Sequence, residues 1–361
     1  MNVKFRATFG AAILSAAAIA VGLLSAPASA DPSPITDYRQ LAGVGSDTTQ
    51  DVMNDLANGT SVVGADGNRI IASWDSTGTS PISIKDPATR PLCTMDRPHG
   101  NDIDALRNDI LAGRSCIDFV RMSRGPLASG TELTWIPFAR DAVTWTTDLT
   151  SPIGAQPPGN LASPSLTISQ LRSIYTTCSY TDAAGVQRPV QPLLPPFGSG
   201  PRQSWLLALG LSEDDVRLAR ASGVCAGYKD TDLGNDGTAI TNLNQIMPYS
   251  VAQWIAQGKS LPGVPNRRGE SRLRAVSNQA PITGSGPATT LNSSFVFSHD
   301  VYNVIQTTRL NTSPILATFV GAGAKVCSPA SIAVIKNYGF GDLNADLALS
   351  NCGDTNLTGW R

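Results

Sequence analysis

The chain alternates short apolar runs with segments whose apolar residues recur every three or four positions. The run 41–44 predicts a buried strand, the polar turn 45–49 follows it, and the spacing of apolar residues over 52–57 predicts a helix packed on one face. Further strands are predicted at 69–74 and 117–121, and further helices from Asn101 or Asp102, after Thr167, around 202–209, 213–221 and 250–257, and after Ser328. Strands that alternate with helices in this way are typical of an α/β protein with a largely parallel sheet.

Two extended stretches, 135–146 and 300–306, interrupt this alternation and are candidates for crossings between two lobes. The length of 361 residues exceeds what one hydrophobic core usually supports. We therefore expect a first lobe formed by 31–140 and completed by 301–361, which includes the return crossing, and a second lobe at 141–300.

The first 30 residues have the pattern of a secretory signal peptide. Lys4 and Arg6 precede an apolar run over 9–24, and the small residues of 28–30 (ASA) form a cleavage site after Ala30. The run is short for a membrane span, and no cysteine stands at the cleavage point to accept a lipid. We expect a secreted protein, extracellular or periplasmic, that does not span a membrane once cleaved; a retained N-terminal anchor is the alternative.

Composition excludes several classes of protein. Hydrophobic residues make up 41% of the chain, and the formal net charge is −1. A disordered chain would combine low hydrophobicity with high net charge. The near balance of 27 basic and 28 acidic residues does not suit a nucleic-acid binder.

Six cysteines in an exported chain predict disulfides, although six allow 15 connectivities. Our hypothesis pairs sequence neighbours, namely Cys93 with Cys116, Cys178 with Cys225, and Cys327 with Cys352. His99 and His299 are the only histidines, which argues against a structural zinc site or a histidine-based triad, and we expect no cofactor and no metal.

Three junctions, at 45–49, 99–102 and 198–202, place small or hydroxyl residues just before a predicted helix. The start of a helix offers free backbone N–H groups and partial positive charge, and glycine lets an anion approach closely. Each junction alone could be an ordinary helix cap. Together they favour an anion pocket, near which lie Asp47, Arg121, Arg124 and Arg202.

Several segments resemble, in order, motifs of the phosphate-binding proteins of high-affinity phosphate ABC transporters. The resemblance rests on 42–52 (AGVGSDTTQDV), on 118–126 (DFVRMSRGP), on 166–175 (LTISQLRSIY), on 198–202 (GSGPR), on 246–250 (IMPYS) and on 300–306 (DVYNVIQ). It implies a two-lobed type II periplasmic-binding-protein fold with a ligand cleft between lobes that two extended crossings join.

The resemblance also implies ligand-binding residues. These are Ser46, Asp47, Thr48, Gly100, Asn101, Ser123, Arg124, Ser199, Gly200 and Arg202. Two departures matter: Arg124 stands where the family has an aspartate, and Pro195 where it has an arginine, whose charge Arg202 would replace.

The function we expect is capture of phosphate or a related oxyanion, by a monomer, for an ABC permease, with no enzymatic activity. Two alternatives stay open. An extracellular phosphoester hydrolase would use Ser199 or Thr48 as its nucleophile, although the glycines that abut Ser199 do not form the G-x-S-x-G elbow. A ligand-free adhesion or scaffold protein would keep the fold alone.

Overall fold

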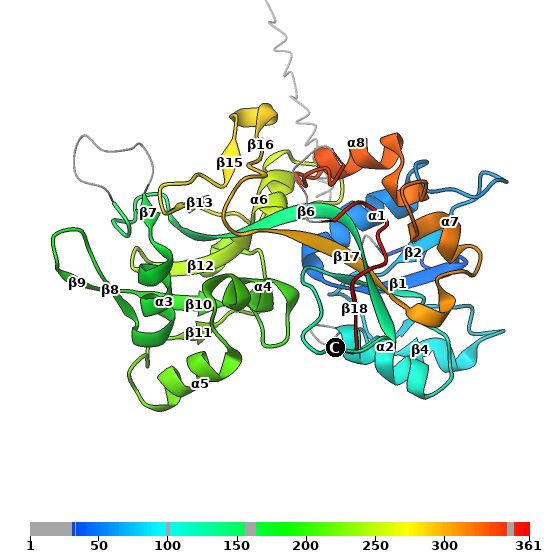
Figure 1. Ribbon diagram of the computed structural model, residues 1–361, viewed down its shortest axis with the longest axis horizontal. Coiled ribbons are helices and arrows are strands. Elements are labelled where there is room, and N and C mark those ends of the chain that lie inside the picture. Colours follow the sequence, from blue (N-terminus) through cyan, green and yellow to red (C-terminus); the bar gives the residue numbers. More distant parts are fainter. Residues whose placement is uncertain (1–30, 33, 99–101, 156–163, 345–349) are drawn as a thin grey trace, which may run out of the picture.

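Two lobes lie side by side and share a pair of long strands in the computed structural model (Figure 1). The structure describes residues 31–32, 34–98, 102–155, 164–344 and 350–361. The predicted signal peptide lies outside these ranges, as do Gly100 and Asn101 of the predicted ligand set.

One sheet runs through both lobes, in the strand order β11-β10-β12-β6-β17-β5-β1-β2. Its strands are β11 (Lys229–Asp230), β10 (Gln191–Leu194), β12 (Gln245–Ser250), β6 (Leu133–Asp148), β17 (Ser298–Gln306), β5 (Phe119–Met122), β1 (Leu41–Gly45) and β2 (Ile71–Ser73), and β13 (Ser271–Leu273) and β18 (Thr358–Gly359) also pair with β6. The strands on either side of the central pair are mutually parallel, as expected from the α/β pattern.

The central strands β6 and β17 are antiparallel to each other and connect the lobes. The first part of β6 pairs with β17, and its last residues pair with β12 of the second lobe. Both extended stretches predicted from the sequence, 135–146 and 300–306, lie within these strands. The predicted lobe boundaries, at 140 and 300, also fall within them and stay a prediction.

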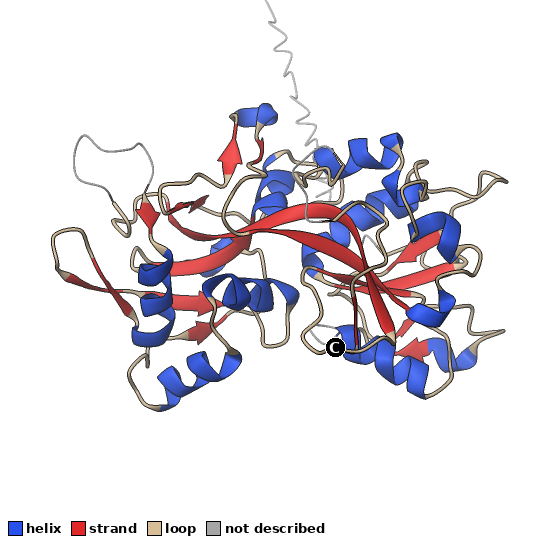
Figure 2. Cartoon of the chain, in the orientation of Figure 1, coloured by secondary structure: helices blue, strands red, loops and turns tan. Residues whose placement is uncertain are grey.

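Helices lie around the strands in each lobe (Figure 2). They are α1 (Gln50–Asn58), α2 (Asp102–Leu111), α3 (Ile168–Thr177), α4 (Gly200–Leu209), α5 (Glu213–Ala221), α6 (Val251–Gly258), α7 (Ile315–Phe319) and α8 (Pro329–Asn337). The predicted caps are confirmed: Thr167 and Gln170 bond reciprocally at the start of α3, and Ser328 caps α8.

Short elements complete the described chain. The short strands are β3 (Ile82–Ser83), β4 (Thr94–Met95), β7 (Ser165–Leu166), β8 (Ser179–Thr181), β9 (Gln187–Pro189), β14 (Ala275–Val276), β15 (Ile282–Thr283) and β16 (Thr290–Leu291), and 3-10 turns occur at Asp47–Thr49, Pro91–Cys93, Gly237–Ala239, Gly286–Ala288, Thr307–Arg309 and Lys325–Cys327. The sequence pattern did not predict these strands, because two or three residues are too few to show a period.

Each lobe has its own hydrophobic core. In the first lobe, Phe119 of β5 packs against Phe319 of α7 with ring centroids 5.0 Å apart. In the second, Trp205 of α4 lies between Tyr175 and Phe297, at 5.8 and 5.9 Å. Helix α6 contributes to both cores, so it ties the lobes together beside the central strands.

The disulfide prediction is confirmed. Cys93 bonds to Cys116, Cys178 to Cys225, and Cys327 to Cys352, and no cysteine is free. Each bridge closes a segment of 23 to 47 residues, so all three are local to one part of the fold.

Within the described ranges, no helix has the length and apolar character needed to cross a membrane. In the same residues, no group of three or more histidine, cysteine, aspartate or glutamate side chains could hold a metal ion.

Candidate functional site

A small polar cavity lies where the two lobes meet. It is lined by Ser46, Asp47, Ser76 and Asp102 on the first lobe and by Pro196, Ser199, Gly200 and Gly234 on the second. The cavity has room for a single water molecule, because the centre of a water-sized sphere can move through only about 10 Å³. The lobes are therefore closed on each other, and a larger ligand needs them to part slightly.

The first-lobe wall is the turn after β1. Gly45 has a φ of +128°, and a Cβ at this position would lie 2.5 Å from the carbonyl oxygen of Arg121, so only glycine fits. Ser46 then caps the following turn, its Oγ accepting a hydrogen bond from Thr48 N at 3.3 Å. Ser46, not Asp47, is therefore the capping residue, and Asp47 Oδ2 lies 2.9 Å from the Cβ position of Gly234 across the interface.

The second-lobe wall is the start of α4. Ser199 is the N-cap residue but makes no capping bond, and its buried Oγ has no hydrogen-bond partner among the described residues. Gly200 follows, and a Cβ there would lie 2.1 Å from Ser123 Oγ and 3.2 Å from Ser46 Oγ. The absence of a side chain at Gly200 lets α4 begin in contact with the first lobe.

Four residues that line the cavity were not predicted as ligand-binding residues, namely Ser76, Asp102, Pro196 and Gly234. Asp102 is the first residue of α2, so a third helix start faces the cavity, and Ser76 lies in the loop after β2. The sequence did predict a helix start at 101 or 102, but it gave no reason to place Asp102 opposite Asp47. Asp47 follows β1 and Asp102 opens α2, and both line the cavity although they lie 55 residues apart in the chain.

Arg121 supplies positive charge beneath the Ser46 turn. Its side chain is fully buried and donates to the carbonyl oxygens of Gly45 and Trp74, both at 2.8 Å, and to Ser73 Oγ at 2.9 Å. Burial lowers its pKa, and surrounding carboxylates oppose that shift. Because these bonds occupy its donors, Arg121 acts on the cavity through its charge and by fixing the turn.

Thr48 does not line the cavity but carries the contacts that close it. Its Oγ1 accepts a hydrogen bond from Asn235 Nδ2 at 3.2 Å, and its carbonyl oxygen accepts one from Gln253 Nε2 at 2.8 Å. Asn235 has a φ of +52°, a conformation that asparagine tolerates better than most residues. These partners lie about 190 to 200 residues further along the chain, so sequence reasoning had no signal for them.

The structure does not bring Arg202 to the cavity. Its guanidinium donates to Glu213 at 2.8 Å, to Asp230 at 2.5 Å and to the carbonyl oxygen of Pro195 at 3.1 Å. The side chain therefore braces α4 against α5 and β11 instead of replacing the charge of the family's missing arginine.

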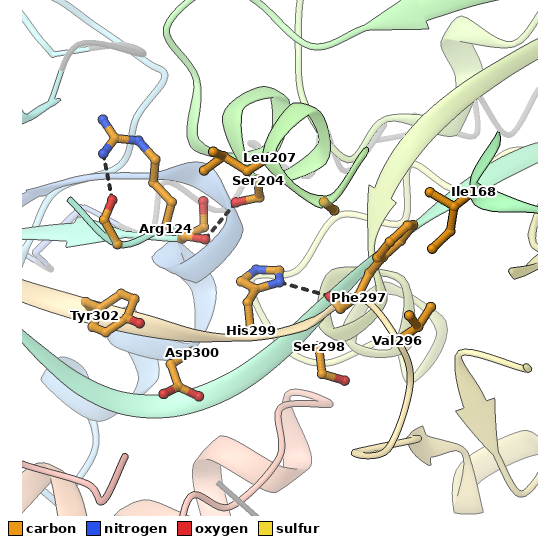
Figure 3. A pocket seen from close by; sticks show the side chains of 13 residues that line it. Arg124, Ile168, Ser204, Leu207, Val296, Phe297, Ser298, His299, Asp300 and Tyr302 are labelled. Atoms are coloured by element: carbon orange, nitrogen blue, oxygen red, sulfur yellow. Dashed lines mark hydrogen bonds between the residues drawn. The ribbon is translucent and has the colours of Figure 1, made fainter. Parts of the chain in front are cut away.

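Ser123 and Arg124 lie at the end of β5 and line a second, larger pocket of about 400 Å³ (Figure 3). Arg124 donates to the side chain of Gln203 and to the carbonyl oxygen of Gly125, and burial lowers its pKa to about 10. The buried Oγ of Ser123 has no partner among the described residues. The predicted ligand residues are thus divided between two adjoining spaces.

The fold is that of the two-lobed type II periplasmic binding proteins. Among solved structures, the chain is similar to a substrate-binding protein assigned to a phosphate ABC transporter of Clostridium perfringens, solved with bound phosphate (13% identity, TM-score 0.50, covering 83% of this chain and 98% of that one). It is also similar to an ABC-type phosphate transport receptor from Vibrio cholerae (14% identity, TM-score 0.51, covering 83% and 99%). No family model and no curated protein matches the sequence.

Proposed function

We propose that this protein is an exported solute-binding protein that captures a small oxyanion, phosphate or a close relative, for import by an ABC permease. The observation that carries the proposal is the meeting of three helix starts, from both lobes, at one closed polar cavity. Helix N-termini stabilise negative charge. The buried Oγ of Ser199 has no partner among the described residues, so it can donate a hydrogen bond to a ligand oxygen.

The mechanism is closure of the lobes around a dehydrated anion. The backbone N–H groups of Asp47 and Gly200, with the hydroxyls of Ser46 and Ser199, hold the ligand by oriented dipoles. The N–H groups of Ser46, Thr48 and Ser199 already donate within the protein. The buried charge of Arg121 lies behind the first turn and adds a long-range attraction. Thr48 links the turn at the cavity to later segments of the chain, since it accepts hydrogen bonds from Asn235 and Gln253.

The two carboxylates at the cavity restrict which oxyanion fits. Asp47 and Asp102 would repel a fully ionised ligand in a site with little water. A ligand that keeps a proton can donate it to one carboxylate oxygen, as a monoprotonated phosphate can and sulfate cannot. This charge arrangement favours phosphate over sulfate.

Calorimetric titration of the mature protein with phosphate, arsenate and sulfate tests the proposal. A ligand at about 100 times its dissociation constant should stabilise the fold by about 2.7 kcal/mol, so a thermal melt gives a second readout. Replacing Ser199 with alanine should weaken phosphate binding about fivefold or more, by removing one hydrogen bond of about 1 kcal/mol. The fold should be almost unaffected, because Ser199 makes no capping bond.

Ser212 provides the matched control. It is the N-cap of the next helix, α5, and there it forms a full capping box with Asp215. Ser212→Ala should therefore cost about 1 kcal/mol of stability and leave phosphate affinity unchanged. If Ser199→Ala behaves in the same way, Ser199 is a helix cap and not a ligand residue.

A ligand-free scaffold is a second candidate, and one observation favours it. The cavity is about the size of one water molecule, and hydrogen bonds cross directly between the lobes, from Ser204 Oγ to the carbonyl oxygen of Ser123 and from Asn235 Nδ2 to Thr48 Oγ1. Under this candidate none of the three anions shifts the melting curve at millimolar concentration. The hydrolase alternative has no comparable support, because no histidine or lysine lies among the described residues that line the cavity.

A further inference from the structure

The larger pocket lies beside the anion cavity at the junction of the lobes. Its floor is β17, which contributes His299 and Tyr302, and one wall comes from α4, which contributes Leu207 (Figure 3). The first lobe closes the pocket with Ser123 and Arg124. At about 400 Å³ it has room for a small organic molecule, whereas the anion cavity does not.

Gly200 and Ser123 lie in close contact between the anion cavity and the larger pocket. Gly200 lines the cavity, Ser123 lines the pocket, and a Cβ on Gly200 would lie 2.1 Å from Ser123 Oγ. Ser123 Oγ is buried and has no hydrogen-bond partner among the described residues, so its rotation breaks no bond there. A small separation of the lobes would join the two spaces into one.

The walls of the pocket differ in character. Leu207, Val296 and Phe297 form an apolar side, and the exposed fractions of Leu207 and Val296 are 55% and 47%. His299 and the stem of Arg124 also line the pocket, with Leu207 beside Arg124 and Phe297 beside His299 (Figure 3). Apolar side chains left open at the mouth of a pocket are typical of a surface that binds an apolar group.

The charged groups around the pocket do not repel an anionic ligand strongly. The one carboxylate in the lining, Asp300, points away from α4 (Figure 3) and is paired with Arg140 at 3.4 Å. In the described part of the chain, no carboxylate lies within ion-pair distance of Arg124, although its side chain is almost fully buried. Arg124 donates to Gln203 and to the carbonyl oxygen of Gly125, and the nearby carboxylates of Asp102 and Asp104 partly offset its charge.

The geometry points to a substrate class larger than inorganic phosphate: a small organic phosphate or phosphonate. Its phosphoryl group sits in the anion cavity, and its apolar group extends past Ser123 into the pocket against Leu207 and Phe297. This inference rests on the proposed function, because the phosphoryl group occupies the same cavity.

Calorimetry with inorganic phosphate and phenylphosphonate as probes tests it. The phenyl ring is apolar and smaller than the pocket, and the phosphonate carries the same type of oxygens as phosphate. Phenylphosphonate should bind at least about tenfold more tightly, which corresponds to about 1.4 kcal/mol. Burial of the ring against the apolar wall is the physical reason.

A pair of leucine variants locates the ring. Leu207→Asp places a carboxylate on the pocket wall and should weaken phenylphosphonate about tenfold while leaving inorganic phosphate unchanged. Leu218→Asp, on α5, is the matched control, because Leu218 has nearly the same exposed fraction, 56%, and does not line the pocket. It should change neither affinity.

Each outcome separates this inference from the proposed function. If phosphate binds and phenylphosphonate binds no more tightly, the substrate class is wrong and the oxyanion receptor stands. If the advantage of phenylphosphonate survives Leu207→Asp, the ring lies elsewhere and the inference is overturned. If neither probe binds, the proposed function fails with it.

Discussion

Gln253 of α6 donates a hydrogen bond from Nε2 to the carbonyl oxygen of Thr48, 2.8 Å away in the turn that lines the anion cavity. Helix α6 packs into the cores of both lobes, so this bond ties the first-lobe turn to the element that joins them. Asp51 of α1 also bonds to Gln253. One buried amide therefore holds both the turn and the helix that follows it.

Replacing Gln253 with leucine should lower the free energy of unfolding by about 1–3 kcal/mol, because the buried carbonyl of Thr48 loses its partner. Urea denaturation measures the change. Gln187→Leu is the control: Gln187 makes a bond of the same length to Thr181 on an exposed hairpin, and its loss should cost less than about 0.5 kcal/mol. Equal losses of unfolding free energy in the two variants would show that the buried Gln253 bond stabilises the fold no more than the exposed Gln187 bond does.

Asp51 should make the stability of the fold depend on pH. Burial raises its pKa from 3.8 to about 6, and the nearby carboxylate of Asp75 adds to the shift. The folded state therefore holds a proton that the unfolded chain releases, so stability falls as the pH rises from about 4 to 6 and levels off above that range. Two pKa units correspond to about 3 kcal/mol.

The variant Asp51→Asn removes this titration and tests the sign. We take the free energy of unfolding of Asp51→Asn minus that of the native protein. This difference should be about 3 kcal/mol larger at pH 8 than at pH 4. Urea denaturation of both proteins at the two pH values gives the result. A constant difference between them would mean that Asp51 titrates normally.

The Cys178–Cys225 bridge should contribute more stability than the other two disulfides. It closes the longest segment, 47 residues against 23 and 25, and loop closure of that length removes about 4 kcal/mol of chain entropy from the unfolded state. The double variant Cys178→Ala/Cys225→Ala should show the largest loss in denaturant, and Cys327→Ala/Cys352→Ala is its comparison. Mass spectrometry of unreduced, alkylated protein should find no modified cysteine.

Sequence reasoning predicted the elements whose signals are local. The apolar spacing of α1, the helix start at Thr167 and the extended stretch within β6 are signals that act within a few residues, and the structure confirms them. The disulfide pairing followed from the same locality, because each bridge joins neighbouring cysteines in the chain.

Side-chain partners from distant segments could not be predicted in the same way. Arg202 looked like a ligand residue because it follows Ser199 and Gly200, but Glu213 and Asp230 bind its guanidinium. The sequence does not reveal which of several nearby carboxylates a buried arginine will meet. Asp102 and Gln253 went unpredicted as parts of the site for the same reason.

The position of Asp47 leads to a prediction about anion selectivity. From the sequence, Asp47 is either a ligand contact, or a residue that pairs with Arg124 or caps its own helix. Ser46 is the cap in the structure, Asp47 lines the cavity, and Arg124 lies in the neighbouring pocket. The Asp47 carboxylate is therefore placed to accept a hydrogen bond from a protonated ligand. Phosphate should bind more than about tenfold more tightly than sulfate, a difference in binding free energy of about 1.4 kcal/mol.

Asp47→Asn tests that role. Asparagine can donate a hydrogen bond as well as accept one, so a fully ionised anion is repelled by Asp102 alone and sulfate binding should rise toward that of phosphate. Calorimetric titration of both anions measures the ratio. Asp66→Asn, in an exposed loop, changes the net charge by the same amount and should leave the ratio unaltered. If the ratio in Asp47→Asn equals that of the native protein, the carboxylate does not face the ligand, and Asp102 is then the side chain that must account for any preference for a protonated anion.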